Sequence, residues 1–376
     1  MNVAVDGRAI TGRYTGDRTY WRNLIRAMLS APDPPKLTVY TRIPVDAAEA
    51  AWLGQAEFIS LPAANDRVWS LLVLPRAIQA KPPDVLHVQY NVPPRIPCPV
   101  VTTVHDVSFR LYPQWYRPYD RLLLNMFAAA SMRRAARVIT VSESSRRDIL
   151  RLYDLDPGLV IATPLGLPEE FLNPRDKFAE SLSQVRATYG LDAPFVFSVG
   201  VLQPRKNLAF LAEAFAVARQ SAAGGMDLVI AGKPGWGGSA EEIVDRARSA
   251  NNGADPAWLR LLGYVPDGDL PALYAASLFY CHPAMYEGFG LPPLEAMACG
   301  TPVLVSDRPA MPEVVGDAAL IAPLEQQQFQ SALVRMMTDP ALRESLAALG
   351  PPRAARFTWR STAARTIQAY KDVTAS

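Results

Sequence analysis

Short apolar runs alternate with longer amphipathic segments along the whole chain, and this alternation restricts the fold more than any other feature. The runs have the length of strands and the segments between them have helical periodicity, which is typical of βα units that form a parallel sheet covered on both faces. We predict strands in two sets, at 2–5, 37–40, 84–88, 100–104, 137–141 and 159–162, and at 195–200, 227–231, 259–263, 278–281, 302–305 and 319–321. The chain is therefore predicted to be an α/β protein with two doubly wound parallel sheets.

The two sets of strands predict two domains, because 376 residues exceed what one hydrophobic core usually supports. Residues 163–190 are too irregular and too interrupted by proline and glycine to extend either sheet. We predict an N-terminal domain over 1–170, a linker over 171–190 and a C-terminal domain over 191–356. Ligands of open α/β sheets bind at the carboxyl ends of the strands, so the functional residues are expected to converge in a cleft between the domains.

Composition argues against several classes of protein. The formal net charge of +2 disfavours a nucleic-acid binder held by phosphate neutralisation. Cys98, Cys281 and Cys299 are too widely spaced for a disulfide framework or a zinc ribbon. The N-terminus is predicted to be a buried strand rather than a signal peptide, and no apolar run reaches the ~18 to 20 residues that cross a bilayer. We expect a cytoplasmic protein, and the basic N-terminal half leaves open a peripheral contact with the inner membrane face.

Two loops of the C-terminal half follow predicted strands and have the composition of anion sites. Arg205 and Lys206 lie between a strand and a helix, with Asn207 expected as the helix N-cap. Two cations beside a helix N-terminus suit a diphosphate and stabilise the charge that grows on it when a bond to phosphate breaks. A glycine-rich loop begins at Gly232, where a ligand could approach the backbone closely. Taken alone, an exposed basic turn explains Arg205 and Lys206 equally well, and a flexible surface turn explains the glycine-rich loop better than a ligand site does.

The segment from His282 to Val303 carries the most specific pattern in the chain. Gly288 and Gly290 predict a turn whose N–H groups face an anion, and a proline in the first turn of the following helix leaves those donors free. Glu287 precedes this turn and Glu295 lies on the helix after it. Two carboxylates that flank an anion site can accept hydrogen bonds from hydroxyl groups on either side of a diphosphate, as in a nucleotide-sugar site.

This segment resembles the E-x7-E donor-binding signature of glycosyltransferase family 4, the retaining group 1 glycosyltransferases of GT-B type. The family pattern runs close to P-S-x-x-E-G-F-G-L-P-x-L-E-A-M-A-C-G-T-P-V, and within its core only Ala284 departs from it. The resemblance covers residues 190–325. It implies two Rossmann-like domains that face each other across a cleft, the N-terminal one on the acceptor side. It also implies that a terminal helix within 357–376 returns to the N-terminal domain.

The resemblance assigns roles to individual positions. It implies that Arg205 and Lys206 hold the diphosphate, that Glu287 contacts the transferred sugar, and that Glu295 binds the ribose hydroxyls. The remaining donor-site residues that it implies are Gly232 in the glycine-rich loop, Tyr264 and Val265 at the base, and Gly288, Phe289, Gly290 and Leu291 around the phosphates and sugar.

Two positions of the N-terminal half are added to the site by the same resemblance. His105 follows a predicted strand, and although an isolated histidine is more often structural, family members with a similar His-Asp dipeptide use the histidine near the donor sugar. We therefore include His105 among the catalytic residues and leave Asp106 either as its orienting partner or as a structural residue. Gly16 belongs to the segment from Tyr14 to Leu24, which resembles the family's glycine-rich first loop followed by its first helix. Arg18 stands where many members have a second glycine, so it either supplies charge or partly occludes the loop.

Two further segments have alternative interpretations. Residues 119–137 have an apolar face and several arginines, which fits membrane-surface docking but fits an ordinary packing helix better. Asp267 and Asp269 resemble a D-x-D metal motif, but their place between a strand and a helix favours a turn with Asp269 as the cap. No metal site and no cofactor are predicted, and the family resembled needs no metal.

The predicted activity is transfer of a hexose from a nucleoside diphosphate sugar to a glycan or lipid-linked acceptor, with retention of configuration. The run His105-Asp106-x-Ser108-Phe109, followed by Pro113 and Trp115, resembles mannosyltransferases of bacterial polysaccharide assembly and favours GDP-mannose as the donor. Two alternatives remain: a nucleotide-sugar epimerase that shares the fold, and a catalytically idle nucleotide-sugar-binding protein. The expected partners are the donor and the acceptor, and no nucleic acid.

Overall fold

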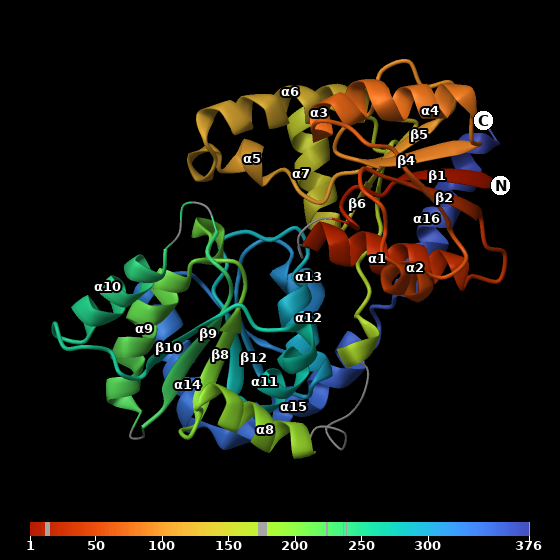
Figure 1. Ribbon diagram of the computed structural model, residues 1–376. Coiled ribbons are helices and arrows are strands. Elements are labelled where there is room, and N and C mark those ends of the chain that lie inside the picture. The colour runs from red at the N-terminus through yellow and green to blue at the C-terminus, as the bar shows by residue number, and fades with distance from the viewer. Residues whose placement is uncertain (12–15, 172–178, 223–224, 236, 238, 376) are drawn as a thin grey trace. The chain divides into compact units, whose positions relative to one another are not determined.

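A computed structural model describes residues 1–11, 16–171, 179–222, 225–235, 237 and 239–375 (Figure 1). The chain divides into two compact units. The first unit comprises Met1–Gly166 with Thr358–Ser376, and the second comprises Leu167–Phe357. The C-terminal helix thus belongs to the first unit, where α1 (Gly16–Leu29) packs against α16 (Trp359–Thr374).

The first unit is built on a seven-stranded parallel sheet in the order β3-β2-β1-β4-β5-β6-β7. Its strands are β1 (Asn2–Asp6), β2 (Lys36–Thr41), β3 (Glu57–Ser60), β4 (Val85–Gln89), β5 (Val100–Thr103), β6 (Arg137–Thr140) and β7 (Val160–Ala162). The central strands are buried along most of their length because helices cover both faces. Besides α1 and α16 these are α2 (Ala47–Leu53), α3 (Asp66–Val68), the π-helix η1 (Trp69–Val73), α4 (Leu74–Ala80), α5 (Ser108–Leu111), η2 (Pro113–Trp115), α6 (Pro118–Arg134) and α7 (Glu143–Tyr153).

The second unit is built on a six-stranded parallel sheet in the order β10-β9-β8-β11-β12-β13. Its strands are β8 (Phe195–Val199), β9 (Asp227–Ala231), β10 (Leu259–Gly263), β11 (Phe279–His282), β12 (Val303–Ser306) and β13 (Leu320–Ala322). Its helices are η3 (Glu169–Phe171), α8 (Ala179–Tyr189), η5 (Pro204–Lys206), α9 (Leu208–Ser221), α10 (Ala240–Ala250), η6 (Asp267–Asp269), α11 (Leu270–Ala276), α12 (Leu291–Ala298), α13 (Met311–Val315), α14 (Gln326–Thr338) and α15 (Pro340–Ala354). Helices α9, α10 and α14 share one hydrophobic core with the sheet.

The predicted fold class is confirmed, since both sheets are parallel and covered by helices (Figure 1). One strand, β3, was not predicted, because its four residues are only half-buried or exposed at the edge of the sheet and give a weak pattern. The stretch 171–190, predicted as a linker, contains α8. This helix packs on α11 within the second unit, and Arg186 donates a hydrogen bond to the Ala276 carbonyl.

The order of strands reverses once in each sheet, and this reversal positions the functional residues. In the first sheet β1 lies between β2 and β4, and in the second β8 lies between β9 and β11. The loops that leave β1 and β4, or β8 and β11, run to opposite sides of the sheet, so a crevice opens between them at the carboxyl ends of the strands. No helix among the described residues is both long enough and apolar enough to cross a membrane.

Candidate active site

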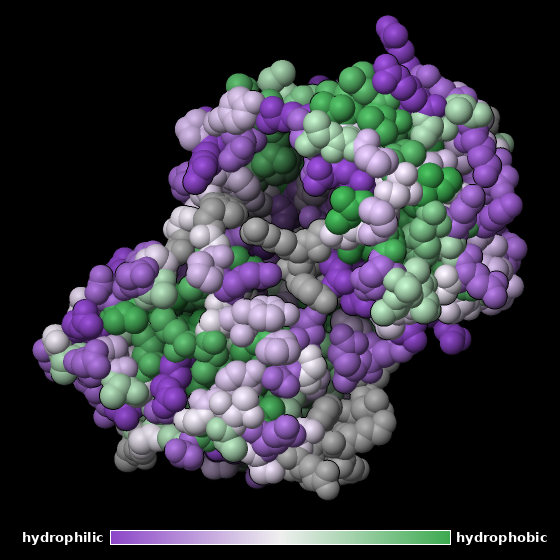
Figure 2. Space-filling model, viewed as in Figure 1, coloured by the Kyte–Doolittle hydropathy of each residue, from purple (hydrophilic) through white to green (hydrophobic). Residues whose placement is uncertain are grey.

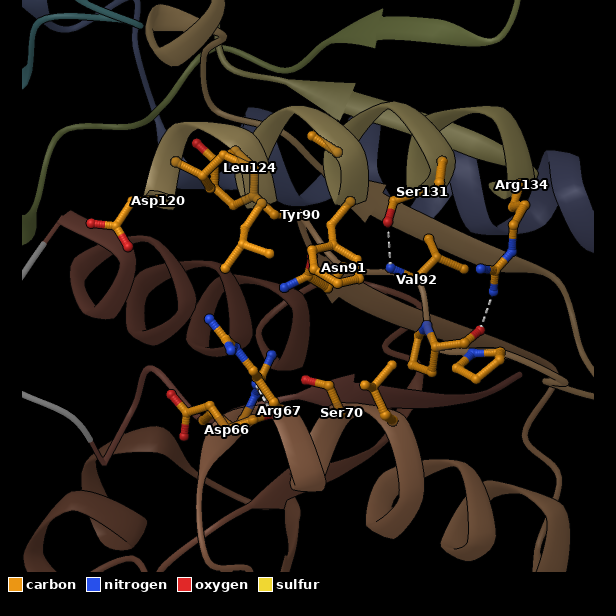
Figure 3. A pocket seen from close by; sticks show the side chains of 18 residues that line it. Asp66, Arg67, Ser70, Tyr90, Asn91, Val92, Asp120, Leu124, Ser131 and Arg134 are labelled. Carbon is orange, nitrogen blue, oxygen red and sulfur yellow. Dashed lines mark hydrogen bonds between the residues drawn. The ribbon is translucent and has the colours of Figure 1, made fainter. Parts of the chain in front are cut away.

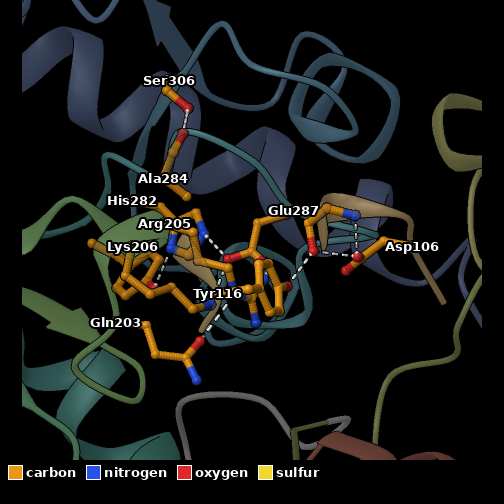
Figure 4. Close-up of polar contacts among 11 residues, drawn as sticks. Asp106, Tyr116, Gln203, Arg205, Lys206, His282, Ala284, Glu287 and Ser306 are labelled. Atoms are coloured by element: carbon orange, nitrogen blue, oxygen red, sulfur yellow. Dashed lines mark hydrogen bonds and ion pairs between the residues drawn. The ribbon is translucent and has the colours of Figure 1, made fainter. Parts of the chain in front are cut away.

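Three residues predicted for the donor site come together in the second unit, at the point where its strand order reverses. Arg205 and Lys206 lie on η5, which follows β8, and Glu287 lies in the loop that follows β11. Arg205 Nη1 lies 2.9 Å from Glu287 Oε2, and Lys206 Nζ contacts Glu287 Oε1 (Figure 4). A backbone hydrogen bond of 2.8 Å from Met285 to Arg205 holds the two loops together. The residues are adjacent because their strands are neighbours in the sheet.

Glu287 has a third partner that the sequence analysis missed. His282 Nε2 lies 3.2 Å from Glu287 Oε1, and Tyr280 Oη lies 3.0 Å from His282 Nδ1. Since the ionised carboxylate only accepts, we assign the His282 proton to Nε2, and Tyr280 then donates to Nδ1. Tyr280 and His282 are two residues apart on β11 and so point to the same face of the sheet. That spacing at the end of a strand was the signal in the sequence.

The electrostatics of this cluster keep Glu287 ionised and His282 neutral. Burial opposes ionisation of Glu287, but the charges of Lys206 and Arg205 outweigh it and hold the pKa of Glu287 well below its ordinary range. Burial lowers the pKa of His282, although Glu287 acts in the opposite direction. The cluster therefore contains two cations and one anion, which leaves a net positive charge for an anionic ligand.

Glu295 lies on α12, where it accepts a hydrogen bond of 2.9 Å from the Tyr274 hydroxyl. Desolvation raises the pKa of Glu295 to about 7, and the hydrogen bond from Tyr274 reduces this effect. Glu287 and Glu295 therefore differ in charge near neutral pH, because only Glu287 has cations as direct partners.

Different contacts explain why glycine is required at two positions of the predicted site. A Cβ at Gly290 (φ 112°) would lie 2.4 Å from Met311 Cε, and α12 begins directly after this residue, at Leu291. A Cβ at Gly232 would lie 1.9 Å from the Gly200 carbonyl oxygen, so the packing of two protein loops already requires a glycine there. Gly288 is buried. Donor contact by these residues remains a prediction.

The aromatic residues predicted for the site differ in exposure. Phe289 is buried, and its ring lies 5.6 Å from that of Phe357, so its side chain belongs to the packed interior of the second unit. Tyr264 is half exposed, with Lys233 Nζ 5.4 Å from the centre of its ring, whereas Val265, the next residue, is buried. An exposed aromatic ring suits stacking against a nucleobase. Trp236, in the neighbouring glycine-rich loop, lies outside the described residues.

In the first unit, His105 follows β5 and keeps one ring nitrogen without a hydrogen bond. Its Nε2 lies 3.5 Å from Asp17 Oδ1 and makes no hydrogen bond within the described residues. The edge of its ring packs on Tyr20, at 4.8 Å between ring centres. Burial lowers the pKa of His105, and Asp17 and Asp106 oppose that shift. The structure thus buries this nitrogen without a hydrogen bond to the described residues, and contact of His105 with the donor sugar remains a prediction.

Asp106 has a structural role. Its Oδ1 accepts hydrogen bonds from the Ser108 amide (2.9 Å) and hydroxyl (2.6 Å), and Ser108 also bonds the Tyr116 hydroxyl (Figure 4). The carboxylate thus shapes the turn that leads into α5, and it makes no hydrogen bond to the His105 ring.

A buried network under His105 was also missed from the sequence. His87 Nδ1 lies 2.6 Å from Tyr370 Oη, and His87 Nε2 lies 2.8 Å from Thr103 Oγ1, which also bonds Tyr20 at 2.9 Å. Burial and the neighbouring His105 lower the pKa of His87 to about 3, so it is neutral. The network fixes Tyr20, the ring on which His105 packs.

In the first turn of α1, Arg18 stands where many members of the resembled family have a second glycine. Gly16 begins α1, and a Cβ built on it would meet no atom within 4 Å. Arg18 bonds the Ile10 carbonyl (2.9 Å) and Glu49 (3.0 Å), so Glu49 and the backbone engage its guanidinium within the first unit. Tyr14 and Thr15 lie outside the described residues.

Two expected helix caps do not form. Asn207 stands at the start of α9 but has a left-handed backbone (φ 57°) and no capping hydrogen bond from its side chain. Asp269 does not cap α11, because its side chain accepts a hydrogen bond of 2.6 Å from Tyr189. Within the described residues no group of histidine, cysteine and acidic side chains is arranged to hold a metal.

Comparisons with known proteins cover both units. The family model described as Glycosyltransferase Family 4 matches residues 15–171, and that described as Glycosyl transferases group 1 matches residues 185–351. The chain is similar to O-antigen chain mannosyltransferase B of Escherichia coli, with 35% identity over 72% of this chain and 70% of that protein. It is also similar to MMP alpha-(1->4)-mannosyltransferase of Mycolicibacterium hassiacum, with 30% identity over 73% of this chain and 65% of that protein.

Solved structures are similar over the whole chain. Sucrose-phosphate synthase from Thermosynechococcus elongatus matches with a TM-score of 0.76 and covers 100% of this chain and 99% of its own. Its sequence identity is 20%, so this likeness concerns the fold alone.

Proposed function

This chain belongs to glycosyltransferase family 4, the group 1 glycosyltransferases of GT-B fold, and we propose that it transfers mannose from a nucleoside diphosphate donor to a glycan acceptor with retention of configuration. The observation that carries the proposal is the convergence of Arg205, Lys206 and Glu287 where the strand order of the second sheet reverses. Two cations match the diphosphate, and the carboxylate matches a sugar hydroxyl.

The proposed reaction breaks the bond between the anomeric carbon and the diphosphate, and a hydroxyl oxygen of the acceptor attacks that carbon from the same face. The departing diphosphate takes the hydroxyl proton, so atoms and charge balance without a nucleophile from the protein. Arg205 and Lys206 stabilise the negative charge that grows on the diphosphate. When the donor binds, the diphosphate replaces Glu287 as their partner, and Glu287 then accepts a hydrogen bond from the sugar.

Several observations support mannose as the sugar and an enzyme that needs no metal. Both relatives described above carry mannosyltransferase names, and the run from His105 to Phe109 resembles mannosyltransferases. We propose GDP-mannose as the donor, with its base beside Tyr264 and its ribose at Glu295. Arg205 and Lys206 supply the two positive charges that a divalent metal would otherwise bring to the diphosphate.

The experiment that tests this function combines binding and turnover. Thermal shifts of the full chain are measured with GDP, UDP, ADP and dTDP and their common sugar conjugates, with and without EDTA. A ligand at 100 times its Kd adds about 2.7 kcal/mol to the free energy of unfolding, so a specific base stands out. Transfer to a mannose-containing oligosaccharide is then followed by GDP release, and the anomeric configuration of the product by NMR.

Each result separates the alternatives. Acceptor-dependent GDP release and an α-linked product, unaffected by EDTA, support the proposal. Conversion of the nucleotide sugar to an isomer without acceptor would identify an epimerase. Donor binding with no turnover on any glycan tested would identify an idle binding protein, and loss of activity with EDTA would overturn metal independence.

A further inference from the structure

A cluster of buried rings lies behind the two glutamates of the second unit. The ring centres of Tyr274 and Tyr280 are 5.2 Å apart, and those of Tyr280 and His282 are 5.9 Å apart. Tyr274 donates a hydrogen bond to Glu295, and His282 contacts Glu287. Figure 2 shows hydrophobic and hydrophilic side chains interspersed on one face of the second unit, whereas this cluster is buried inside it. One packed group of rings therefore supports both carboxylates.

His282 is completely hydrogen-bonded, unlike some other buried polar groups of the chain. The Ser70 hydroxyl, for example, is buried beside a cavity of the first unit and makes no hydrogen bond to a described residue (Figure 3). Both ring nitrogens of His282 have partners, Tyr280 at 3.0 Å and Glu287 at 3.2 Å. A buried polar network with all its members satisfied is rigid and has one arrangement. The orientation of the His282 ring is therefore fixed before a donor binds.

The two carboxylate oxygens of Glu287 lie in different surroundings (Figure 4). Oε1 contacts His282 and Lys206, whose side chains are 2% and 10% exposed. Oε2 contacts Arg205, whose side chain is 23% exposed. Oε1 is thus the inner oxygen and Oε2 the outer one, and a ligand that arrives from solvent meets Oε2 first.

One of these three contacts is suited to persist when a diphosphate binds. Arg205 and Lys206 are cations, and charge-assisted hydrogen bonds draw both of them to the diphosphate. Burial lowers the pKa of His282, so its ring is neutral, and its other nitrogen is held by Tyr280. The His282 N–H therefore stays on Oε1 of Glu287, while the departure of Arg205 leaves Oε2 open to a hydroxyl group.

We propose that His282 is the positioning residue of Glu287 in the donor-bound protein, that Tyr280 fixes its ring, and that Oε2 accepts the hydrogen bond from the transferred sugar. This assignment rests on the proposed transferase function. Without the His282 N–H, a buried carboxylate that has lost its two cations would keep no donor among the described residues. It would then return to Arg205 and Lys206 or take up a proton, because an unpaired buried charge is costly. Either change removes the ionised acceptor from the sugar.

Asparagine and glutamine at position 282 are a matched pair of tests, since both carry an amide. The amide nitrogen of glutamine can take the place of Nε2 and reach Glu287, whereas that of asparagine takes the place of Nδ1 and ends short of it. Tyr280→Phe keeps the packed ring and removes only the hydroxyl group that bonds Nδ1. Should His282→Asn fail to fold, Tyr280→Phe and the NMR measurement below still test the proposal.

The first measurement compares the affinities for GDP and GDP-mannose by calorimetric titration of the full chain. The contact between His282 and Glu287 exists in the free and in the GDP-bound protein, so its loss cancels in the affinity for GDP. The affinity for GDP-mannose includes the sugar contact, and we expect it to fall about tenfold in His282→Asn, about threefold in Tyr280→Phe and less than about twofold in His282→Gln. Equal losses for both ligands, or unchanged GDP-mannose affinity in His282→Asn, would overturn the proposal.

A double-mutant cycle shows whether His282 acts through Glu287. Glu287→Ala removes the carboxylate, so the addition of His282→Asn to this variant should cause no further loss of GDP-mannose affinity. If the two losses multiply instead, His282 acts independently of Glu287 and the proposal is wrong.

Nitrogen NMR tests the assigned proton without reference to the proposed function. The chain has three histidines, so labelling them with ¹⁵N gives few signals, and the spectrum of His282→Gln identifies those of His282. We expect Nε2 of His282 to carry a proton in the free protein and in its GDP complex, and an unprotonated Nε2 in either state would overturn the proposal. Failure of GDP-mannose to bind the parent protein would count against the proposed donor alone, and the NMR result would still decide where the proton lies.

Discussion

The two units differ in whether the polar groups of their candidate sites already have partners within the protein. In the second unit Arg205, Lys206 and the neutral His282 all contact Glu287, so the charged groups are paired within the protein before any substrate arrives. In the first unit the His105 Nε2 and the Ser70 hydroxyl make no hydrogen bond within the described residues. A ligand of the second unit therefore has to displace Glu287 from its cations. In the first unit the two neutral groups have no hydrogen bond to a described residue that would have to be broken.

Charge explains this difference. A buried ion without a partner costs several kcal/mol, whereas an unpaired hydroxyl or neutral imidazole costs roughly 1 to 3 kcal/mol. A fold can therefore leave neutral groups unpaired, but it has to pair buried ions internally. The proposed donor brings negative charge and can replace Glu287 as the partner of Arg205 and Lys206.

Lys206→Ala tests the charged site most strongly. Loss of this ammonium is expected to lower kcat about 10² to 10³-fold, by analogy with removal of one oxyanion donor, because it stabilises charge mainly in the transition state. Steady-state kinetics with varied donor measure the change. Arg248→Ala, which removes a cation from the surface of α10, serves as the control and should leave kcat unchanged. Parent turnover in Lys206→Ala would remove Lys206 from the mechanism.

Glu287→Gln tests whether the paired ions stabilise the second unit. The substitution leaves Arg205 and Lys206 without their anion, and we expect it to lower the free energy of unfolding by about 2 kcal/mol. The effect should be smaller than for a fully buried pair because Arg205 keeps contact with water. GDP should stabilise this variant more than the parent, since the diphosphate restores the missing negative charge.

His105→Asn is the matched change in the first unit. Its ring nitrogen has no hydrogen bond to lose, so the cost in unfolding free energy should stay below about 1 kcal/mol. Chemical denaturation of both variants measures the contrast. If His105→Asn costs as much as Glu287→Gln, the proposed difference between the units is wrong.

The sequence predicted the elements better than the contacts between them. Buried parallel strands have a strong apolar signal, so twelve of the strands were expected, whereas the half-exposed β3 was not. Arg205, Lys206 and Glu287 were grouped through a family resemblance, because a separation of 81 or 82 residues has no local signal of contact. His87 and Tyr370 are 283 residues apart, and nothing in either segment indicates the hydrogen bond between them.

A cavity of about 490 Å³ in the first unit, lined mainly by Asp66 to Leu71, the loop after β4 and α6, illustrates the same limit. Its walls come from three separate segments, and its shape depends on which side of α6 faces the sheet. The sequence indicated an apolar face over residues 119–137 and left open whether it packs or meets a membrane, but in the structure the apolar residues of α6 do not lie on one buried face, since Leu122, Met126 and Phe127 are exposed. Ser70 gave no signal at all, because an unpaired hydroxyl is recognised only once its surroundings are known.

Glu295 allows the smallest and sharpest test, because its pKa of about 7 separates it from the permanently ionised Glu287. A carboxylate accepts hydrogen bonds from ribose hydroxyls better than a carboxylic acid does, so the affinity for GDP should rise as pH increases through about 7. The sign follows from linkage: a ligand that prefers the ionised form lowers the pKa of Glu295 and releases protons on binding. The expected gain between about pH 6 and pH 8 is at most about tenfold, which corresponds to 1.4 kcal/mol.

Glu295→Gln is the control that isolates this carboxyl from the ionisation of GDP itself. Its amide oxygen can still accept the hydrogen bond from Tyr274, but it cannot titrate. Calorimetric titrations with GDP, in two buffers that differ in ionisation enthalpy, measure affinity and proton release for both proteins. The parent should release more protons near pH 7 and gain more affinity with rising pH than Glu295→Gln. Identical pH dependence in the two proteins would mean that Glu295 does not bind the ribose, and the second unit would then recognise the donor through the Arg205, Lys206 and Glu287 cluster without help from this titrating carboxyl.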